Sequence, residues 1–338
     1  MTPESKGEFK PVRVVALGGG TGLSMLLRGL KQHVARRKQD QQRRPISALT
    51  AVVTVTDDGG SSGRLRRDLR MLPPGDIRNC MVALSKDEAL LGRLFQYRFA
   101  EGRGLAGHSF GNLFLTALTH VTGDFNEAIR QAGQVLAIRG RIFPSTTQNV
   151  TLEAVLEDGS VVAGESLISR SQQRIRRVRL HPRTVKPLPE ALEAIRAADV
   201  VMMGPGSLYT SVIPNLLVHG IVHALRRSRA VRVYIANLMT QPGETGGYSV
   251  SDHIRAMDAH TRARVVDWVV VNKAPITPRL RRRYEALGSE PVSYDLKELQ
   301  KLGVKVIFDD LVEEDGVVRH HAPRLTRLLL EEFIHRRR

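Results

Sequence analysis

Cysteine is almost absent from this chain, and long apolar runs are missing as well. Cys80 is the only cysteine among 338 residues, so no disulfide can form within the chain, and such sparse use is typical of a reducing compartment. No apolar run reaches the roughly 18 residues that a membrane-spanning helix needs. Residues 1–10 contain no apolar segment typical of a secretory signal. We therefore expect a cytoplasmic protein without a membrane span, which begins with a disordered lead-in over residues 1–10.

Acidic and aromatic residues are scarce relative to basic ones. The chain has 34 Asp and Glu against 51 Lys and Arg, which gives a net charge of +17 and an isoelectric point near 10.7. Such a charge favours anionic partners, among them nucleotides, sugar phosphates and nucleic acids. Aromatic residues make up only 5% of the chain, and no nucleic-acid-binding motif is present, so no nucleic-acid partner is expected. We interpret the basic stretches 35–44 and 170–186 as solvated charge, with a polyanion-binding patch as the alternative.

A glycine-rich turn near the N-terminus is the strongest local signal. Residues 12–17 form an apolar run typical of a buried strand, Gly18 to Gly22 follow, and leucines at helical spacing begin at Leu23. A glycine turn that opens a helix presents free N–H groups to a phosphate. The stretch does not match the Walker A motif, which ends in Gly-Lys-Ser/Thr, because Leu23 follows Gly22. It does not match the dinucleotide fingerprint either, because Leu23 occupies the position of the third glycine. We therefore infer phosphate binding without assigning ATP or NAD.

A second strand, over residues 46–56, ends in the stretch DDGGSSGR at residues 57–64. Carboxylates at the carboxyl edge of a parallel sheet bind a ribose or hold Mg²⁺ against phosphates, so Asp57 and Asp58 are candidate metal ligands. Gly59, Ser61 and Ser62 add open backbone, and Arg64 adds a cation. In the next segment, Asp76 is expected to cap a helix.

Further polar residues follow at predicted strand ends and helix starts. His108 and Asn112 lie near the start of a predicted helix, where His108 is either an acid–base or phosphate group or a simple cap. Gly204 begins a third glycine-rich strand end, and Asn237 ends another strand. No nucleophile paired with a base is evident, so no catalytic residue is assigned.

Strands and helices alternate along nearly the whole chain. This alternation predicts an α/β protein with a doubly wound, mostly parallel Rossmann-like sheet. We expect one domain over residues 11–335. Alternating apolar residues around a predicted hairpin turn at 158–159 indicate a small β-rich insert at about 141–182.

Five separated stretches carry a family resemblance: residues 17–23, 53–65, 74–79, 108–112 and 204–211. Together they resemble the CofD-like family, and within it the YvcK-type branch, the gluconeogenesis factors. The CofD branch comprises Mg²⁺-dependent 2-phospho-L-lactate transferases. The YvcK-type branch binds UDP-N-acetylglucosamine and is associated with growth on gluconeogenic carbon sources and with cell-shape control. The resemblance thus implies a nucleotide-sugar-binding regulator with an unidentified protein partner and a homodimeric state.

The resemblance also implies roles for particular residues. It places nucleotide and phosphate contacts on Gly19, Gly20, Thr21, Asp57, Asp58, Asn112, Gly206 and Ser207. By short motifs, Tyr284 in RYEALG and Arg319 in GVVRHH are implied in nucleotide-sugar binding. The complete predicted ligand-binding set is Gly18, Gly19, Gly20, Thr21, Gly22, Asp57, Asp58, Gly59, Ser61, Ser62, Arg64, His108, Asn112, Gly204, Gly206, Ser207, Asn237, Tyr284 and Arg319. The alternative function is a Mg²⁺-dependent phosphotransferase-like enzyme, for which no aromatic platform suited to a deazaflavin is evident. A nucleic-acid-binding protein, suggested by the net charge alone, is the third and less favoured alternative.

Overall fold

Seven parallel strands form the central sheet of the structure, a computed structural model that describes residues 11–35, 44–86, 90–171 and 173–335. The strand order is β10-β9-β8-β7-β1-β2-β3, and every neighbouring pair is parallel. The lead-in over residues 1–10 and most of the basic stretch 35–44 lie outside the described residues. The strands are β1 (Val12–Gly18), β2 (Ile46–Val53), β3 (Arg141–Pro144), β7 (Val200–Met203), β8 (Val231–Ile235), β9 (Trp268–Asn272) and β10 (Lys305–Asp309).

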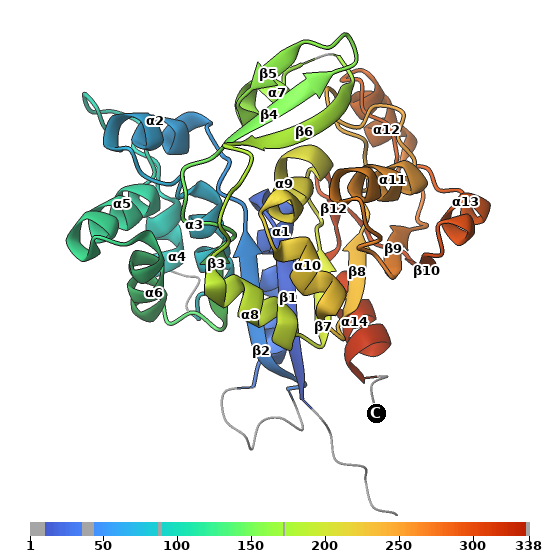
Figure 1. Cartoon of the computed structure of the whole chain (residues 1–338), viewed down its shortest axis with the longest axis horizontal. Coiled ribbons are helices and arrows are strands. Elements are labelled where there is room, and N and C mark those ends of the chain that lie inside the picture. Colours follow the sequence, from blue (N-terminus) through green and yellow to red (C-terminus); the bar gives the residue numbers. More distant parts are fainter. Residues whose placement is uncertain (1–10, 36–43, 87–89, 172, 336–338) are drawn as a thin grey trace, which may run out of the picture.

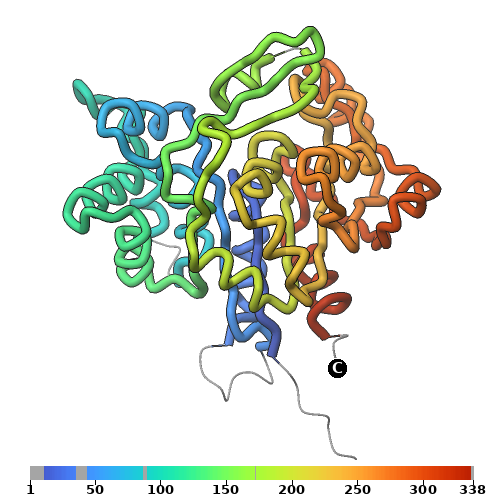
Figure 2. The backbone as a smooth tube through the Cα atoms, in the orientation of Figure 1, coloured from blue at the N-terminus to red at the C-terminus, as the bar shows by residue number. Residues whose placement is uncertain are grey.

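Helices cover both faces of this sheet, which confirms the predicted doubly wound α/β fold (Figures 1 and 2). Helix α1 packs against α3 and α14, whereas α8 packs against α10. The central strands are buried on both faces, as parallel strands between helix layers must be, and this explains their continuous apolar sequences. The helices are α1 (Gly20–Leu30), α2 (Gly60–Leu69), α3 (Gly75–Leu84), α4 (Leu90–Gln96), α5 (Phe110–Thr122), α6 (Phe125–Val135), α7 (Glu165–Ile168), α8 (Pro189–Ala197), α9 (Ile213–Leu217), α10 (Ile221–Arg227), α11 (Val250–Thr261), α12 (Pro278–Glu285), α13 (Leu296–Lys301) and α14 (Ala322–Leu329).

A small antiparallel sheet stands above the carboxyl ends of the central strands (Figure 1). Its strands β4 (Thr151–Leu156), β5 (Val161–Ala163) and β6 (Ile175–His181) lie in the order β5-β4-β6. The insert was predicted to begin at about residue 141, and this boundary is wrong because β3 pairs in parallel with β2 and belongs to the central sheet. With only four residues, β3 is too short for its sequence pattern to distinguish an edge strand from the start of a hairpin.

A second antiparallel pair lies near the C-terminus. Strands β11 (Val312–Glu314) and β12 (Val318–His320) form a short hairpin just before α14. In the described part of the chain, no single helix is both long and apolar enough to cross a membrane, although the bent pair Leu208–Leu217 and Ile221–Arg227 meets the length and composition criteria together.

The strand order reverses between β1 and β7. From β1 the chain builds outward through β2 to β3, and from β7 it builds in the opposite direction through β8 and β9 to β10. The loops that leave β1 and β7 therefore diverge, and a crevice forms between them at the carboxyl edge of the sheet. Open α/β sheets bind their ligands at such a topological switch point.

Candidate functional site

A cleft of about 960 Å³ opens at this switch point. It brings together residues that are far apart in the sequence, from the glycine turn after β1 to the hairpin near the C-terminus. The members of the predicted set that line it are Gly19, Gly20, Thr21, Gly22, Gly206, Ser207, Asn237, Tyr284 and Arg319. The predicted glycines Gly18 and Gly204 lie at the ends of the strands beneath these loops and do not line the cleft.

The two glycine-rich loops pack so closely that side chains are excluded from their contact. A Cβ atom on Gly22 would lie 2.3 Å from the carbonyl oxygen of Pro205. Gly20 has a φ of +64°, a conformation that favours glycine. The first turn of α1 is thereby exposed to the cleft, where its free N–H groups and the helix dipole favour an anion.

Hydrogen bonds hold the loop after β7 in place. The backbone N–H of Gly206 donates to Oδ1 of Asn237 over 3.3 Å, and Nε2 of Gln241 donates to Oγ of Ser207 over 2.7 Å. The Oε1 atom of Gln241 is buried and has no partner among the described residues. Asn237 and Gln241 follow β8, so the end of this strand supports the loop that leaves β7.

Tyr284 and Arg319 line the cleft from the C-terminal part of the chain. Tyr284 lies on α12, and its hydroxyl accepts a hydrogen bond from the backbone N–H of Val318 over 3.0 Å. This bond fixes α12 against β12, which carries Arg319. Within the described ranges Arg319 forms no ion pair, and it lines the cleft together with Arg28 of α1. The cleft thus has two cationic side chains in its lining, Arg319 of β12 and Arg28 in the last turn of α1.

Two carboxyl groups absent from the predicted site also approach the glycine turn. The backbone N–H of Gly20 donates to the carboxylate of Asp76, and burial followed by the charge of Asp57 raises the pKa of Asp76 to about 6. Asp76 was expected to cap α3, but that helix begins at Gly75 without a side-chain cap. The carboxyl group instead lies beside Gly19, where an added Cβ would be 2.6 Å from Oδ2 of Asp76.

Glu165 lines the cleft from α7 of the insert. Burial raises its pKa to about 9, and the charges of Asp57 and Asp76 add to this shift. Its Oε2 atom is buried without a hydrogen-bond partner in the part of the chain that the structure describes. At neutral pH the carboxyl group is therefore protonated and can donate a hydrogen bond. No sequence pattern marks Glu165, because only the folding of the insert over the sheet brings it here.

Asp57 and Asp58 lie behind the cleft and do not line it. Oδ1 of Asp57 accepts a hydrogen bond from Gly59, and Oδ1 of Asp58 accepts one from the N–H of Ser166 over 2.8 Å. Asp58 thus holds the start of α7. Among the described residues, no group of three or more His, Cys, Asp or Glu side chains is placed to hold a metal. Mg²⁺ binding at Asp57 and Asp58 stays a prediction.

The remaining predicted residues form a separate buried cluster. Oγ of Ser61 lies 2.9 Å from Nδ1 of His108 and 3.1 Å from Nδ2 of Asn112. The guanidinium group of Arg64 donates to the carbonyl oxygen of Ala106. These bonds connect α2 to the start of α5 and to the loop before it.

The structure places this cluster outside the lining of the cleft. Eight residues of the predicted set from the segments 57–64 and 108–112 do not line the cleft. They are Asp57, Asp58, Gly59, Ser61, Ser62, Arg64, His108 and Asn112. Burial and the nearby Arg64 lower the pKa of His108. The contact between Ser61 and His108 is a pairing of a hydroxyl with an imidazole that sequence analysis did not find.

The sheet order and the two glycine loops define a doubly wound α/β protein with a crevice at its switch point. The chain belongs to the CofD family, since the family described as 2-phospho-L-lactate transferase CofD matches residues 14–312. This confirms the resemblance found in the sequence.

Several relatives share nearly the full length of the chain. A protein named gluconeogenesis factor from Halalkalibacterium halodurans is 50% identical over 324 residues, which cover 96% of this chain and 97% of the relative. The gluconeogenesis factor of Bacillus subtilis is 46% identical over 320 residues, with 94% and 97% covered. A crystal structure of a Bacillus halodurans protein has a TM-score of 0.89 at 49% identity, and covers 95% of this chain and 100% of that chain. The chain is therefore similar to the gluconeogenesis-factor branch of its family.

Proposed function

We propose that this protein is a cytoplasmic regulator of gluconeogenesis-factor type, which binds UDP-N-acetylglucosamine in the cleft and acts in growth on gluconeogenic carbon sources and in cell-shape control. One observation carries the ligand assignment. Tyr284 and Arg319, implied in nucleotide-sugar binding by resemblance, line the same cleft as the glycine loops, although more than 250 residues of chain separate them from Gly19. The names of the relatives support the regulatory part of the proposal.

The charges around the cleft suit a sugar diphosphate. Its phosphates would lie at the exposed first turn of α1 and beside Gly206 and Ser207, which line the same cleft. Arg28 and Arg319 add two positive charges to the lining of the cleft. The protonated carboxyl group of Glu165 adds a donor without adding a negative charge.

The proposal is tested by calorimetric titration of the protein with UDP-N-acetylglucosamine. Replacing Arg319→Ala removes a charge-assisted contact, which is worth about 1.5–3 kcal/mol, so we expect the affinity to fall roughly tenfold to a hundredfold. Arg279→Ala on the exposed side of α12 is the matched control and should leave the affinity unchanged, because Arg279 does not line the cleft. Equal binding by the Arg319→Ala protein and the wild type would contradict the assigned role of Arg319.

A Mg²⁺-dependent transferase is the alternative function, and the description of the matching family favours it. Asp57 and Asp58 are the predicted metal ligands for such chemistry, and the charge of Asp57 acts on Asp76, whose carboxyl group lies beside Gly19. Titration with GDP, with and without Mg²⁺, distinguishes the two functions. Binding of GDP that requires Mg²⁺ and is lost in Asp57→Asn would support the transferase, whereas selective binding of the UDP-sugar in EDTA would support the regulator.

A further inference from the structure

The two edges of the central sheet differ in what they offer to another strand. The sheet ends at β3 on one side and at β10 on the other, and β10 lies on the side of the molecule opposite α6 (Figure 1). Strand β3 contains Pro144, which has no N–H to donate to a further strand. Strand β10 contains no proline, and none of its five residues is buried, whereas the three middle residues of β9 are. Strand β10 is therefore an open edge.

Alternate residues of β10 direct their backbone groups away from the sheet. The N–H of Lys305 and the carbonyl oxygen of Asp309 bond to the residues just before and just after β9. Because backbone groups alternate in direction along a strand, those of Val306 and Phe308 point outward. No hydrogen bond from another part of the described chain reaches these outward groups. Strand β10 thus offers two donors and two acceptors to a further strand.

The sequence of β10, KVIFD, is complementary to itself in the antiparallel direction. A two-fold axis through Ile307 would pair Lys305 of each copy with Asp309 of the other. The same axis would place Val306 opposite Phe308, the two residues whose backbone groups point outward. Each such pair can exchange two hydrogen bonds, as directly opposed residues of antiparallel strands do. One axis therefore satisfies both the charge pattern and the hydrogen-bonding register.

The charges at the two ends of β10 are available for these pairs. Oδ1 of Asp309 accepts the N–H of Asp310, and its Oδ2 has no hydrogen-bond partner among the described residues. Lys305 is exposed, lies 5.0 Å from the ring centre of Trp268, and forms no ion pair in the part of the chain that the structure describes. Opposite charges on facing strands attract, and like charges repel. The pattern therefore favours an antiparallel second copy and disfavours a parallel one in the same register.

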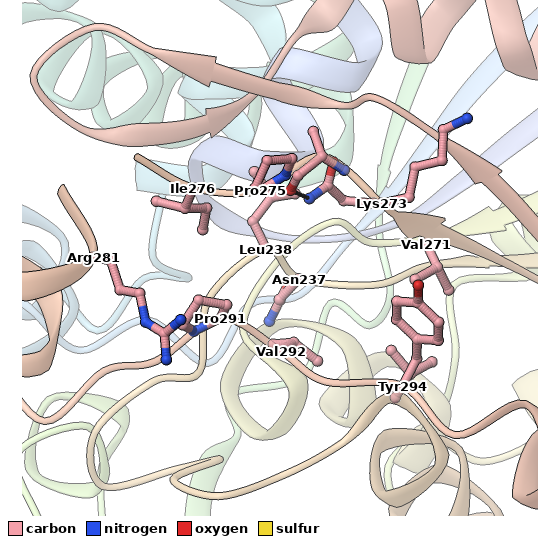
Figure 3. A pocket seen from close by; sticks show the side chains of 13 residues that line it. Asn237, Leu238, Val271, Lys273, Pro275, Ile276, Arg281, Pro291, Val292 and Tyr294 are labelled. Carbon is pink, nitrogen blue, oxygen red and sulfur yellow. Dashed lines mark hydrogen bonds between the residues drawn. The ribbon is translucent and has the colours of Figure 1, made fainter. Parts of the chain in front are cut away.

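Exposed apolar side chains lie beside this edge. The ring of Phe308 packs 4.9 Å from that of Tyr294, which is 43% exposed. The Tyr294 ring also borders a small pocket at the end of β9 (Figure 3). Leu296 is 44% exposed at the start of α13, the helix that packs against β10. A second copy placed on β10 could thus bury apolar surface in addition to forming backbone hydrogen bonds.

We propose that a second copy of this chain docks on β10, so that the two central sheets join in the antiparallel direction about a two-fold axis at Ile307. Each copy presents the same surface to the other, as a closed dimer requires. The carboxyl edge of one sheet then continues as the amino edge of the other, so both clefts stay open. The inference does not depend on which ligand the cleft binds.

Sedimentation velocity of the full chain tests this interface. One strand pair with an apolar margin is a small contact, so the protein should change from monomer to dimer between about 1 and about 200 µM. Asp309→Lys should weaken the dimer roughly tenfold or more, because each end pair then has two positive charges. Combining it with Lys305→Asp should restore the dimer, since opposite charges face each other again. A wild type that stays monomeric, or a double variant as weak as Asp309→Lys, would overturn the inference.

Two further variants separate charge from backbone pairing. Glu193→Lys makes a comparable charge change on exposed α8, away from β10, and should leave the dimer unchanged. Equal weakening by this control would overturn the inference, because net charge alone would then govern association. Val306→Pro removes an outward N–H and no bond to β9, so it should prevent dimerisation without lowering the unfolding temperature. A Val306→Pro protein that dimerises like the wild type would show that β10 is not the interface.

Discussion

Individual carboxyl groups carry the largest electrostatic effects near the cleft. Glu165 and Asp76 are both buried beside Asp57, and each holds its proton more tightly than an exposed carboxyl group does. A phosphate placed beside ionised carboxylates would be repelled. Because Glu165 is protonated at neutral pH, it adds no negative charge that would repel an anionic ligand in the cleft.

We predict that Glu165→Gln flattens the dependence of stability on pH. The pKa of Glu165 rises from 4.5 in the unfolded chain to about 9 in the folded state, so the folded protein binds the extra proton. The free energy of unfolding of the wild type should then fall as pH rises between about 4.5 and 9, by up to about 1.4 kcal/mol per pH unit from this group. Urea unfolding at pH 5, 7 and 9 measures the effect.

The control for this prediction is Glu193→Gln, because Glu193 is exposed on α8. It should follow the wild type at each pH. The Glu165→Gln protein should gain stability relative to the wild type, and this gain should grow with pH. If the two proteins show the same pH dependence, the buried carboxyl group of Glu165 does not titrate as described.

A second prediction concerns the contact between the glycine loops. Gly22→Ala would place a Cβ atom 2.3 Å from the carbonyl oxygen of Pro205, so one loop must move. We expect a loss of about 1–3 kcal/mol in stability and weaker binding of the UDP-sugar, measured by unfolding and calorimetry. Gly246→Ala is the control, since nothing lies within 4 Å of its added Cβ. A Gly22→Ala protein as stable and as tight-binding as the control would show that the loops tolerate separation.

At the scale of elements, the parts predictable from sequence were those with a local pattern. The glycine turn after β1 and the apolar strands have such patterns, and they led to the correct α/β fold. The four-residue strand β3 has none, and its boundary was misplaced. The contact between Ser61 and His108 joins residues 47 positions apart, and Glu165 reaches the cleft only through the position of the insert. Such contacts depend on tertiary packing, which a single sequence does not display.

A hydrogen bond from Ser166 to Asp58 holds the start of α7 in the insert, which gives a prediction for this element. Asp58→Asn weakens the hydrogen bond from Ser166 at the start of α7, and loss of such a cap costs about 1 kcal/mol. We expect faster hydrogen exchange in residues 165–169, measured by mass spectrometry, with little change in the central sheet. Asp158→Asn alters the hairpin turn of the same insert and should leave α7 protected. Equal protection of α7 in wild type and Asp58→Asn would contradict the capping role.

At the scale of the whole molecule, the net charge of +17 attracts an anionic ligand before contact. The insert stands above the carboxyl edge of the central sheet (Figure 1). Arg176 and Arg177 of its strand β6 are exposed. Such charges increase the rate of association, and salt screens them over roughly 10 Å at 0.1 M ionic strength. The electrostatic steering of an anionic ligand toward the cleft therefore depends on the positions of the charges as well as on the net charge.

We predict that Arg176→Glu with Arg177→Glu slows association of UDP-N-acetylglucosamine several-fold at low salt and leaves its dissociation rate unchanged, because neither residue lines the cleft. The same charge change at Arg226 and Arg227, exposed at the end of α10, is the matched control. Because α10 ends just before β8 begins, these two arginines lie near the amino edge of the sheet, where reversal should have a smaller effect. Stopped-flow rates from 20 to about 500 mM salt should converge for all three proteins, since screening removes the long-range attraction. If both double variants slow association equally, net charge alone would attract the ligand, and the position of the insert would have no part in it.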